Sequence, residues 1–499
     1  MELQFTSSGC PHLAVALRDV RMAEVTQEVR LSDGLPDIGR VISSRGQIVL
    51  RSKEGQADQI TVSGGIMVWI LYAPEDGTPL RCVDAWVPFQ MKWETDGSGG
   101  EGPIRISPLL RFVDSRNISA RKMMVRAGVA AMAEALYPAE TEVYAPCELP
   151  EDIQLLTNMY PVRLPQEAGE KTFLIDEDVP LPPDAAAVEK LLCYTITPQL
   201  SEVRTAGDKV IMRGTGEVHV LYRCPEGKLH ALDLEVPISQ YTQLEDTYGT
   251  QATADVQMGV TSLEMDQVEG QQLRLRCGMV AQYLISDRYL AELTEDAYST
   301  RRQVQVQKES LQLPAVMEQR AETVAVRQQL PAMGDEIADV VFLPDFPRQN
   351  KAGDQRILEL PAQYQVLYYA EDGSLQCSSG RWEGSMRIPA DPDIRMDALV
   401  CPQGKARVLL GGADSELTAQ YKMQLNTASS WGMDMVTGLE IGQLQDADPA
   451  RPSLILCRPE GETLWEMAKR CGSTVGDIRR ANGITGEPEE GQLLLIPVN

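Results

Sequence analysis

The chain has 499 residues, of which 43% are hydrophobic and 24% are charged, a composition typical of globular rather than disordered proteins. This length predicts about three or four domains. The 72 acidic and 46 basic side chains give a formal net charge of −26. That balance argues against nucleic acid and anionic membranes as partners, because both are bound through concentrated basic surfaces.

The N-terminal stretch predicts no export signal, and no part of the chain predicts a membrane span. Residues 1–20 lack a basic segment followed by an apolar core. No run approaches the ~18 apolar residues of a spanning helix. The ten cysteines are scattered without a C-x-x-C pair, which favours reduced thiols over disulfides or a zinc site. We therefore expect a cytoplasmic protein with no metal site and no cofactor.

One strand pattern occurs three times, at residues 66–77, 216–227 and 362–373. Each copy has a β-branched or aromatic residue at every second position and ends in an acidic residue followed by glycine. This pattern predicts a half-buried strand that runs into a hairpin turn. Tyr222 minus Tyr72 is 150 residues, and Tyr368 minus Tyr72 is 296 residues. Such offsets are the size of whole domains, not of solenoid repeats.

The first predicted domain is residues 1–150. It opens with an entry segment of unassigned structure up to about residue 20. Val87-Pro88-Phe89 predicts an edge strand, because proline cannot donate a ladder hydrogen bond. The glycine-rich segment 96–102 predicts a hairpin tip, since neither a Lys-Ser/Thr pair nor a helix follows it as in a phosphate-binding loop. Residues 138–152 have the composition of a linker and close the domain.

The second domain, residues 151–305, repeats this order of elements. The third, residues 306–445, is more diverged and is followed by a linker at 446–452. Strand patterns dominate, and helical periodicity is rare before residue 460. We therefore predict a mainly β protein with three tandem β-sandwich-like domains.

Residues 453–499 predict a small α+β module with the order strand, helix, helix, strand. Thr463 and Glu466 have the spacing of a capping box at the start of the first helix. Asn482-Gly483 predicts a left-handed cap at the end of the second helix. The predicted buried face of the first helix consists of Leu464, Met467, Ala468 and Cys471.

Three blocks of this module resemble a LysM domain: residues 461–468, 481–484 and 491–497. The resemblance implies a βααβ fold that binds N-acetylglucosamine polymers, such as peptidoglycan or chitin, between the loop at the first helix and the loop after the second. Two departures are that Glu462 replaces the usual loop aspartate and Leu456-Cys457-Arg458 replaces the usual aromatic-x-Val entry. The implied ligand or partner groove consists of Gly461, Glu462, Thr463, Leu464, Trp465, Asn482, Gly483, Ile484 and Thr485.

The repeated units resemble the SPOCS domain of sporulation proteins. The matching features are a Gly-x-x-x-Val-x-Val/Ile-Leu-Tyr strand, as at 64–72 and 214–222, and a Val-Pro-Phe/Ile strand. SPOCS repeats followed by one LysM domain resemble the arrangement of SipL-type spore morphogenetic proteins. This resemblance implies a mother-cell protein that binds the coat-basement ATPase SpoIVA and helps it to encase the forespore.

The sequence supplies no recognisable catalytic motif. It has only three histidines, His12, His219 and His230, and none lies in a pattern for a Ser-His or Cys-His nucleophile. Zinc-protease, phosphate-loop, dinucleotide and EF-hand motifs are absent. His219 occupies the position of Trp69 and Gln365 in the other copies, which predicts a histidine on the strand surface. Acidic clusters such as 487–490 predict solvated loops.

Two functions therefore fit the sequence. The first is a non-enzymatic scaffold or adaptor in endospore coat or envelope assembly, docking to a SpoIVA-like ATPase through its LysM and β domains. The alternative is a peptidoglycan-binding protein of the spore cortex or cell wall. The missing export signal and the altered LysM entry favour the first. Trp465 lies about 100° from Leu464 on the helical wheel, which predicts a partly exposed ring that either docks a partner or closes the module core.

Overall fold

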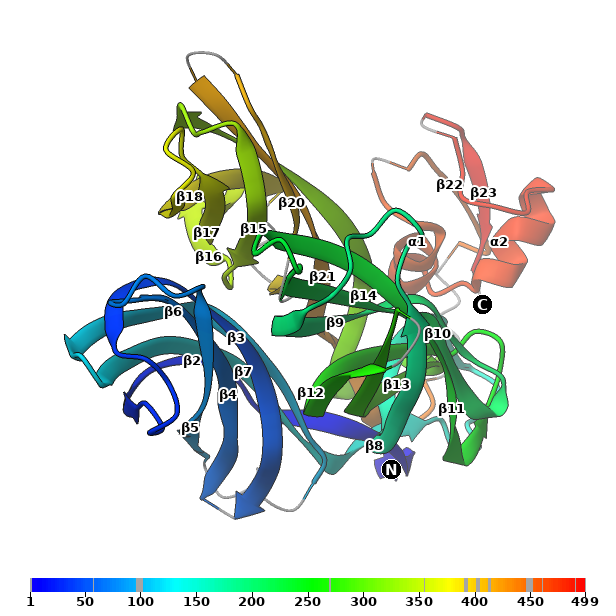
Figure 1. Cartoon of the computed structure of the whole chain (residues 1–499). Helices are drawn as coiled ribbons and strands as arrows, with labels where there is room; N and C mark the ends of the chain where they lie inside the picture. Colours follow the sequence, from blue (N-terminus) through cyan, green and yellow to red (C-terminus); the bar gives the residue numbers. More distant parts are fainter. Residues whose placement is uncertain are drawn as a thin grey trace.

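The computed structural model (Figure 1) covers most of the chain. The described residues are 2–56, 58–95, 102–268, 271–353, 355–389, 394–400, 404–411, 414–445, 452–459, 461–489 and 491–498. The predicted glycine-rich tip at 96–102 and the predicted linker at 446–452 lie outside these residues, except for Gly102 and Pro452.

The first unit consists of two three-stranded antiparallel sheets, with strand orders β2-β7-β6 and β3-β4-β5. Residues from both sheets, among them Ile60, Trp93 and Met123, form one buried core between them. Pro88 lies on β5, which is an edge strand as predicted. The strands are β2 (Thr6–Arg30), β3 (Ile38–Gln56), β4 (Gln59–Pro74), β5 (Arg81–Glu94), β6 (Ile104–Ser119) and β7 (Lys122–Ala145).

The second unit has the same arrangement, with sheets β12-β13-β8 and β11-β10-β9. Its core likewise draws on both sheets, for example through Tyr222 and Met279. The strands are β8 (Ile153–Pro180), β9 (Lys190–Thr205), β10 (Gly207–Arg223), β11 (Leu229–Tyr248), β12 (Thr253–Val268) and β13 (Gln272–Ser299).

The third unit repeats the two layers with more irregular strands. One sheet has the order β1-β21-β14, with β19 and β20 also paired to β21, and the other has the order β15-β17-β16, with β18 on β17. The strands are β1 (Glu2–Gln4), β14 (Val304–Pro331), β15 (Glu336–Pro344), β16 (Arg348–Ala352), β17 (Gln355–Tyr369), β18 (Leu375–Pro389), β19 (Ile394–Val400), β20 (Lys405–Leu409) and β21 (Asp414–Ile441).

The three copies of the repeated sequence are the strands β4, β10 and β17. Each is a middle strand of its sheet, and the three hold Tyr72, Tyr222 and Tyr368. Gly64 and Gly214 of the motif mark close approaches between strands, because a Cβ there would lie 2.3 Å from the Val49 carbonyl oxygen and 2.0 Å from that of Gln199. The predicted mainly β, sandwich-like fold is confirmed, while the boundaries at residues 150, 305 and 445 stay a prediction.

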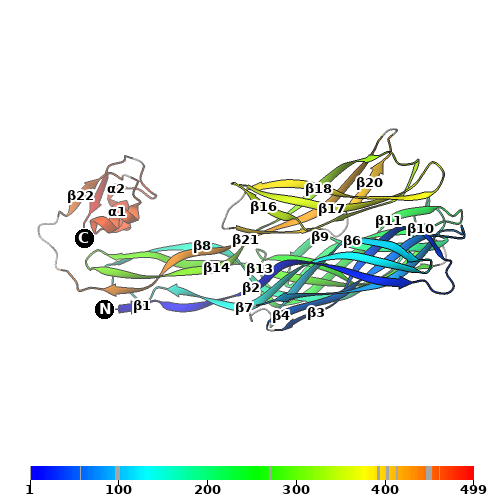
Figure 2. The ribbon, with the colours of Figure 1, turned by 90° about the vertical axis from the view of Figure 1, so that its left-hand side faces the viewer.

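The ribbons β2/β7, β8/β13 and β14/β21 continue beyond the sandwiches and pack together as a stalk (Figure 2). The stalk comprises the paired segments 6–13/138–145, 153–164/287–299 and 304–315/429–441. Its buried residues come from all three ribbons and include Cys10, Val143, Val162, Leu293, Leu311 and Met435.

The entry segment up to residue 20, whose structure the sequence left unassigned, forms β1 and the first half of β2. One sequence prediction about this region is wrong. Residues 138–145 are not linker, because they form the end of β7 and pair with Thr6–Leu13. Their proline and acidic residues suggested a linker. Their pairing partner, Thr6–Leu13, lies more than 120 residues earlier in the chain, so local composition could not predict the pairing.

The sheets that contain the repeated strands also meet one another at their outer faces. A shared apolar cluster there contains Leu71, Leu221 and Leu367, which are related by the offsets of 150 and 296 residues. Ile42, Leu192 and Ala338 are related in the same way and lie in the same cluster. The three units are therefore arranged as a closed ring around a pseudo-threefold axis.

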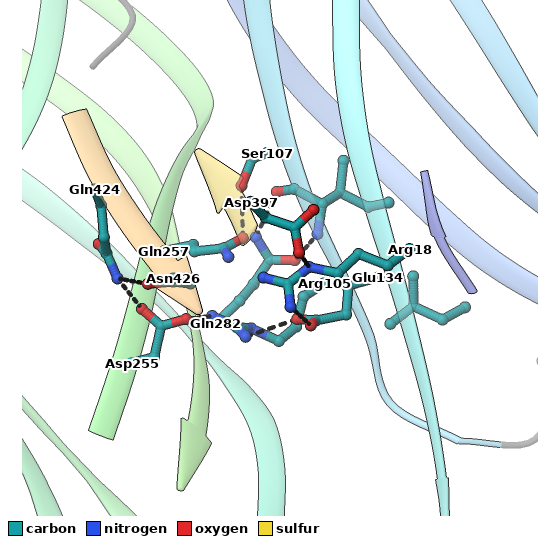
Figure 3. A network of polar contacts seen from close by, with 12 residues as sticks. Arg18, Arg105, Ser107, Glu134, Asp255, Gln257, Gln282, Asp397, Gln424 and Asn426 are labelled. Carbon is teal, nitrogen blue, oxygen red and sulfur yellow. Dashed lines mark hydrogen bonds and ion pairs between the residues drawn. The ribbon is translucent and has the colours of Figure 1, made fainter. Parts of the chain in front are cut away.

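A buried polar network also joins the three units (Figure 3). Arg105 on β6 forms ion pairs with Glu134 at 2.7 Å and with Asp255 of the second unit at 2.6 Å. Asp255 also accepts a hydrogen bond of 2.9 Å from Gln424 of the third unit. Burial raises the pKa of Asp255, but Arg105 outweighs it and the net pKa is lowered. Each charge is thus compensated by a partner from another strand or unit.

The C-terminal module consists of β22 (Leu454–Cys457), α1 (Leu464–Cys471), α2 (Val475–Asn482) and β23 (Leu494–Pro497), as predicted. Thr463 and Glu466 form the capping box. Gly483 closes α2 in the left-handed conformation, with φ of 63°. The face predicted to be buried is buried. Neither helix in the described part of the chain has the length and apolar character needed to cross a membrane.

Candidate functional site

The module brings together the two loops that the sequence predicted to form a binding site. We call residues 461–464 and 482–487 the loop pair. The amide of Leu464, at the start of α1, donates a hydrogen bond of 2.8 Å to the Glu487 carboxylate in the second loop. Glu487 satisfies an amide that the helix itself leaves without a partner. The sequence had placed Glu487 in a solvated acidic cluster, so its role in joining the loops was missed.

The carboxylates of Glu462 in the first loop and of Glu466 in the first turn of α1 are paired inside the module. Glu462 accepts hydrogen bonds of 3.1 and 2.7 Å from the Arg470 guanidinium. Glu466 accepts a hydrogen bond of 2.8 Å from the amide of Thr463, and this bond lowers the pKa of its carboxyl group. The loop therefore offers hydrogen-bonding groups and backbone rather than unpaired charge.

The nine predicted site residues divide into structural and accessible ones. Leu464 is fully buried, and Ile484 packs against the same core. The side-chain amide of Asn482 donates to the carbonyl groups of Ile478 and Leu495 at 2.8 and 2.6 Å, so it ties α2 to β23. The exposed members are Gly461, Thr463, Gly483 and Thr485.

Trp465 does not lie free beside the loop pair but contacts the end of β13. Its indole Nε1 donates a hydrogen bond of 2.9 Å to the Asp296 carboxylate. Its ring meets Tyr298 edge-on, with 4.7 Å between centroids. Lys469, one turn further along α1, forms an ion pair of 2.7 Å with Asp296. Burial raises the pKa of Asp296, but the bonds from Lys469 and Trp465 outweigh it and the net pKa is lowered.

Tyr298 completes the hydrophobic core of the module. It is 5% exposed and belongs to the same buried cluster as Leu464 and Met467. Its hydroxyl donates a hydrogen bond of 2.8 Å to the Ser473 carbonyl group. We refer to Asp296, Tyr298, Trp465 and Lys469 as the module latch. No local pattern at residues 296–298 indicates this role, because the module begins more than 150 residues later in the chain.

The histidines are engaged in structural contacts. His12, in the entry segment of unassigned structure, is buried on β2, with its Nδ1 3.1 Å from the Cys10 carbonyl oxygen. His219 is not on a free strand surface, because the third unit covers that face. Its Nδ1 lies 2.7 Å from Asp233 and its Nε2 lies 2.9 Å from Asp339, which also pairs with Arg45 of the first unit at 3.0 Å. Both ring nitrogens therefore face carboxylates.

The His219 contacts predict how stability depends on pH. Burial lowers the pKa of His219, but Asp339 and Asp233 outweigh it and raise the pKa from 6.5 to about 10. Below pH 6.5 the histidine is protonated in both the folded and the unfolded chain, so its stabilising effect is complete. As pH rises from 6.5 to 10, only the folded chain retains the proton, and the stabilisation is lost.

We therefore expect His219→Gln to lower the free energy of unfolding by about 2 kcal/mol at pH 6, the scale of hydrogen bonds to charged groups. The difference from the parent protein should shrink steadily towards pH 10. Urea unfolding at several pH values measures it. His230→Gln serves as the control, and a His219→Gln deficit that stays constant from pH 6 to pH 10 would contradict the assignment.

The structure defines a class of protein in which a mainly β body carries a small βααβ module at its end. The family model of the SipL SPOCS domain matches residues 187–268, and that of the LysM domain matches residues 460–497. The chain therefore has the domain combination of SipL-type sporulation proteins, as the sequence predicted. No curated protein and no solved structure matches it.

The matched segments agree with the structure. The SPOCS match spans β9 to β12 of the second unit, and the LysM match spans α1, α2 and β23. Both are non-catalytic binding domains, and LysM is the kind of module that binds peptidoglycan. The combination fits a sporulation protein with a peptidoglycan-binding type of module.

Proposed function

We propose that this protein is a non-enzymatic adaptor in endospore coat or envelope assembly, built from three SPOCS-type units and one LysM module. Its partner is a protein of the SpoIVA-like morphogenetic ATPase type on the mother-cell side of the forespore. The observation that carries this proposal is the orientation of the module. The latch holds the α1 side against the stalk, while Gly461, Thr463, Gly483 and Thr485 of the loop pair stay exposed.

The latch makes the adaptor a rigid display of the loop pair. An ordered surface loses less conformational entropy on binding than a module on a flexible tether does. Buried polar groups elsewhere support the same view, since Arg105, Asp255 and His219 join units to one another. They serve cohesion of the body rather than catalysis.

The alternative function is binding of an N-acetylglucosamine polymer of the cortex or cell wall. It is supported by the LysM match at residues 460–497. Trp465 is the only aromatic residue between 453 and 499, and its ring packs on Tyr298. The module thus has little aromatic surface to stack on a sugar, which favours a protein partner.

Thr485→Arg tests the adaptor proposal, because Thr485 is exposed in the loop pair. We expect this variant of the tagged full-length chain to capture a SpoIVA-like ATPase from sporulating cells at least tenfold less well than the parent. Gly476→Arg is the matched control. It places the same charge on an exposed position of α2 outside the loop pair, where an added Cβ meets nothing closer than 3.8 Å.

Calorimetry with chitin oligomers distinguishes the two functions. The adaptor proposal expects no measurable heat with the full chain. Micromolar oligomer binding that Thr485→Arg abolishes and Gly476→Arg preserves would replace the adaptor by the wall-attachment function. If both variants capture the ATPase equally well, the loop pair is not part of the interface.

A further inference from the structure

We infer that the end of the body remote from the module is a second docking surface, which accepts a lysine or arginine side chain of a partner protein. This surface lies outside the LysM module and involves none of its residues. The inference therefore stands whether the loop pair binds a protein or a glycan.

The surface is built from the three repeated turns. Gly77, Gly227 and Gly373 have φ values of 73°, 86° and 75°, which only glycine adopts readily, so these turns require the glycine of each copy. All three glycines line one cavity of about 680 Å³. The sequence repeat thus places one hairpin from each unit around a single opening on the pseudo-threefold axis.

The cavity has an apolar floor and a charged rim. We call it the socket. The floor contains Ile42, Leu80, Tyr369 and Leu375, and the rim contains Glu226, Asp335 and Glu371. The three rim carboxylates are on exposed residues. Glu336 adds a fourth carboxylate to the lining, against the two cations Arg40 and Lys228, so acidic groups are in surplus.

Hydrogen bonds between units hold the socket in shape. Arg40 of the first unit donates to the Leu375 carbonyl group of the third at 2.9 Å. Arg223 of the second donates to the Leu80 carbonyl group of the first at 2.9 Å. The Leu229 amide of the second donates to the Tyr369 hydroxyl of the third at 2.8 Å. Every pair of units is joined, so the socket exists only when the ring is closed.

One lysine of the chain already binds in this way. The Lys228 ammonium group forms an ion pair of 2.6 Å with Glu336 and lies 5.8 Å from the centroid of the Tyr369 ring. The bond to Glu336 raises the pKa of Lys228. An ammonium group between a carboxylate and an aromatic face is a favourable arrangement. Around the same opening, Glu226, Asp335 and Glu371 provide further carboxylates that a second cationic head could pair with.

The chemistry of the socket selects its occupant. Lysine and arginine combine an apolar stem with a cationic head, which matches an apolar floor under a carboxylate rim. A wholly apolar segment would remove water from the rim carboxylates without compensating their charge. An acidic segment would be repelled. The net charge of −26 also favours the approach of a basic partner over long range.

The socket and the module lie at opposite ends of the body. The strand β7 runs from Lys122, at the end of the body away from the module, to Ala145 in the stalk. Residues 36–38 lie at the Lys122 end, because the Ile38 amide donates to the Ala120 carbonyl group. Tyr72 of β4, near the turn, lies at this end too, because its hydroxyl donates to the Pro36 carbonyl group. The turns thus cap the end away from the stalk, where the module docks (Figure 2). One chain can therefore contact two partners at once.

Methyl NMR of the full-length chain, labelled at isoleucine and leucine, tests this inference. The probe is arginine amide, and citrulline amide is an analogue of nearly the same shape that has the same α-amino group but a neutral side chain. We expect arginine amide to shift the methyl signals of Leu80 and Leu375 in a saturable way, and citrulline amide to leave them in place. The double variant Asp335→Asn/Glu371→Gln should weaken the arginine response at least fivefold.

A matched variant separates the socket from the general acidity of the protein. Glu292→Gln/Glu309→Gln removes the same charge from exposed positions on the stalk and should leave the response unchanged. The inference is overturned if citrulline amide shifts the same signals equally, if the stalk variant weakens binding as much, or if Leu80 and Leu375 do not respond. A failure of Thr485→Arg to affect ATPase capture would concern only the loop pair.

Discussion

Arg105→Ala is expected to lower the free energy of unfolding by about 3–5 kcal/mol, the cost of removing one member of a buried ion network. Arg105 is 2% exposed, and its removal leaves the Asp255 carboxylate buried without its cation and Glu134 with only Arg18, at 3.4 Å. Because Asp255 belongs to the second unit, the variant should also loosen the ring. Urea unfolding gives the loss in stability, and small-angle scattering shows whether the body expands.

The triple variant Arg105→Met/Glu134→Gln/Asp255→Asn provides the control. It removes the cation together with both carboxylates, so no buried charge is left uncompensated, and much of the lost stability should return. A stability of Arg105→Ala within 1 kcal/mol of the parent would show that the network does not hold the units together.

Tyr298→Ala should have the second largest effect, and it should be confined to the module. Removing a buried aromatic ring from a core typically costs about 3–5 kcal/mol. The cluster around Leu464 and Met467 is small and includes Tyr298 from the body. We therefore expect the module amides to exchange with solvent at least a hundredfold faster while the amides of β4 and β10 keep their protection. Hydrogen exchange read by mass spectrometry resolves the two regions.

Tyr298→Phe is the matched control for this prediction. It keeps the ring against Trp465 and loses only the hydrogen bond to the Ser473 carbonyl group, a change of about 1 kcal/mol. Its module should therefore exchange only a few times faster. If Tyr298→Ala leaves module exchange unchanged, the module core does not depend on the body.

The features that the sequence predicted correctly are those that depend on local or periodic patterns. The repeated tyrosines, such as Tyr72, mark middle strands because a strand with one face on a core shows period two. The strand around Tyr72 is not half-buried as predicted, however, because Trp69 and Leu71 on its other face are also buried. The capping box at Thr463 is equally local, since it satisfies amides of the same helix turn. In the module these rules predicted the elements and the buried helix face.

The closing of the three units into a ring was not predicted, because it depends on pairs far apart in the chain. One signal was nevertheless present. Leu71, Leu221 and Leu367 are apolar in all three copies although they face away from the sandwich cores, and a strand that is apolar on both faces is typically covered on both. His219 is a polar exception on the same face. Its partner Asp339 lies in another unit, so its burial could not be predicted from the local sequence.

In the candidate site, too, local features were predicted and contacts with distant parts of the chain were not. The loop residues Gly461 to Thr485 were predicted through the LysM resemblance, and the structure joins the two loops through Glu487 and Leu464. Trp465 was given the choice between docking a partner and closing the core. The structure packs its ring, partly buried, against the module core and also bonds its indole nitrogen to Asp296, because the module packs on the end of a strand that its own sequence does not contain.

The strand β1 has a consequence for how the protein is made. Glu2 pairs with Glu440 and Gln4 pairs with Gly438, so β1 leaves the ribosome long before the strand β21 with which it pairs. At roughly 5–20 residues per second, synthesis of the intervening chain takes on the order of 20–90 s. During that interval Cys10 and Val143 cannot be covered by the third ribbon. The stalk is thus completed late in biosynthesis, and a nascent chain that stalls before β21 leaves this apolar surface uncovered.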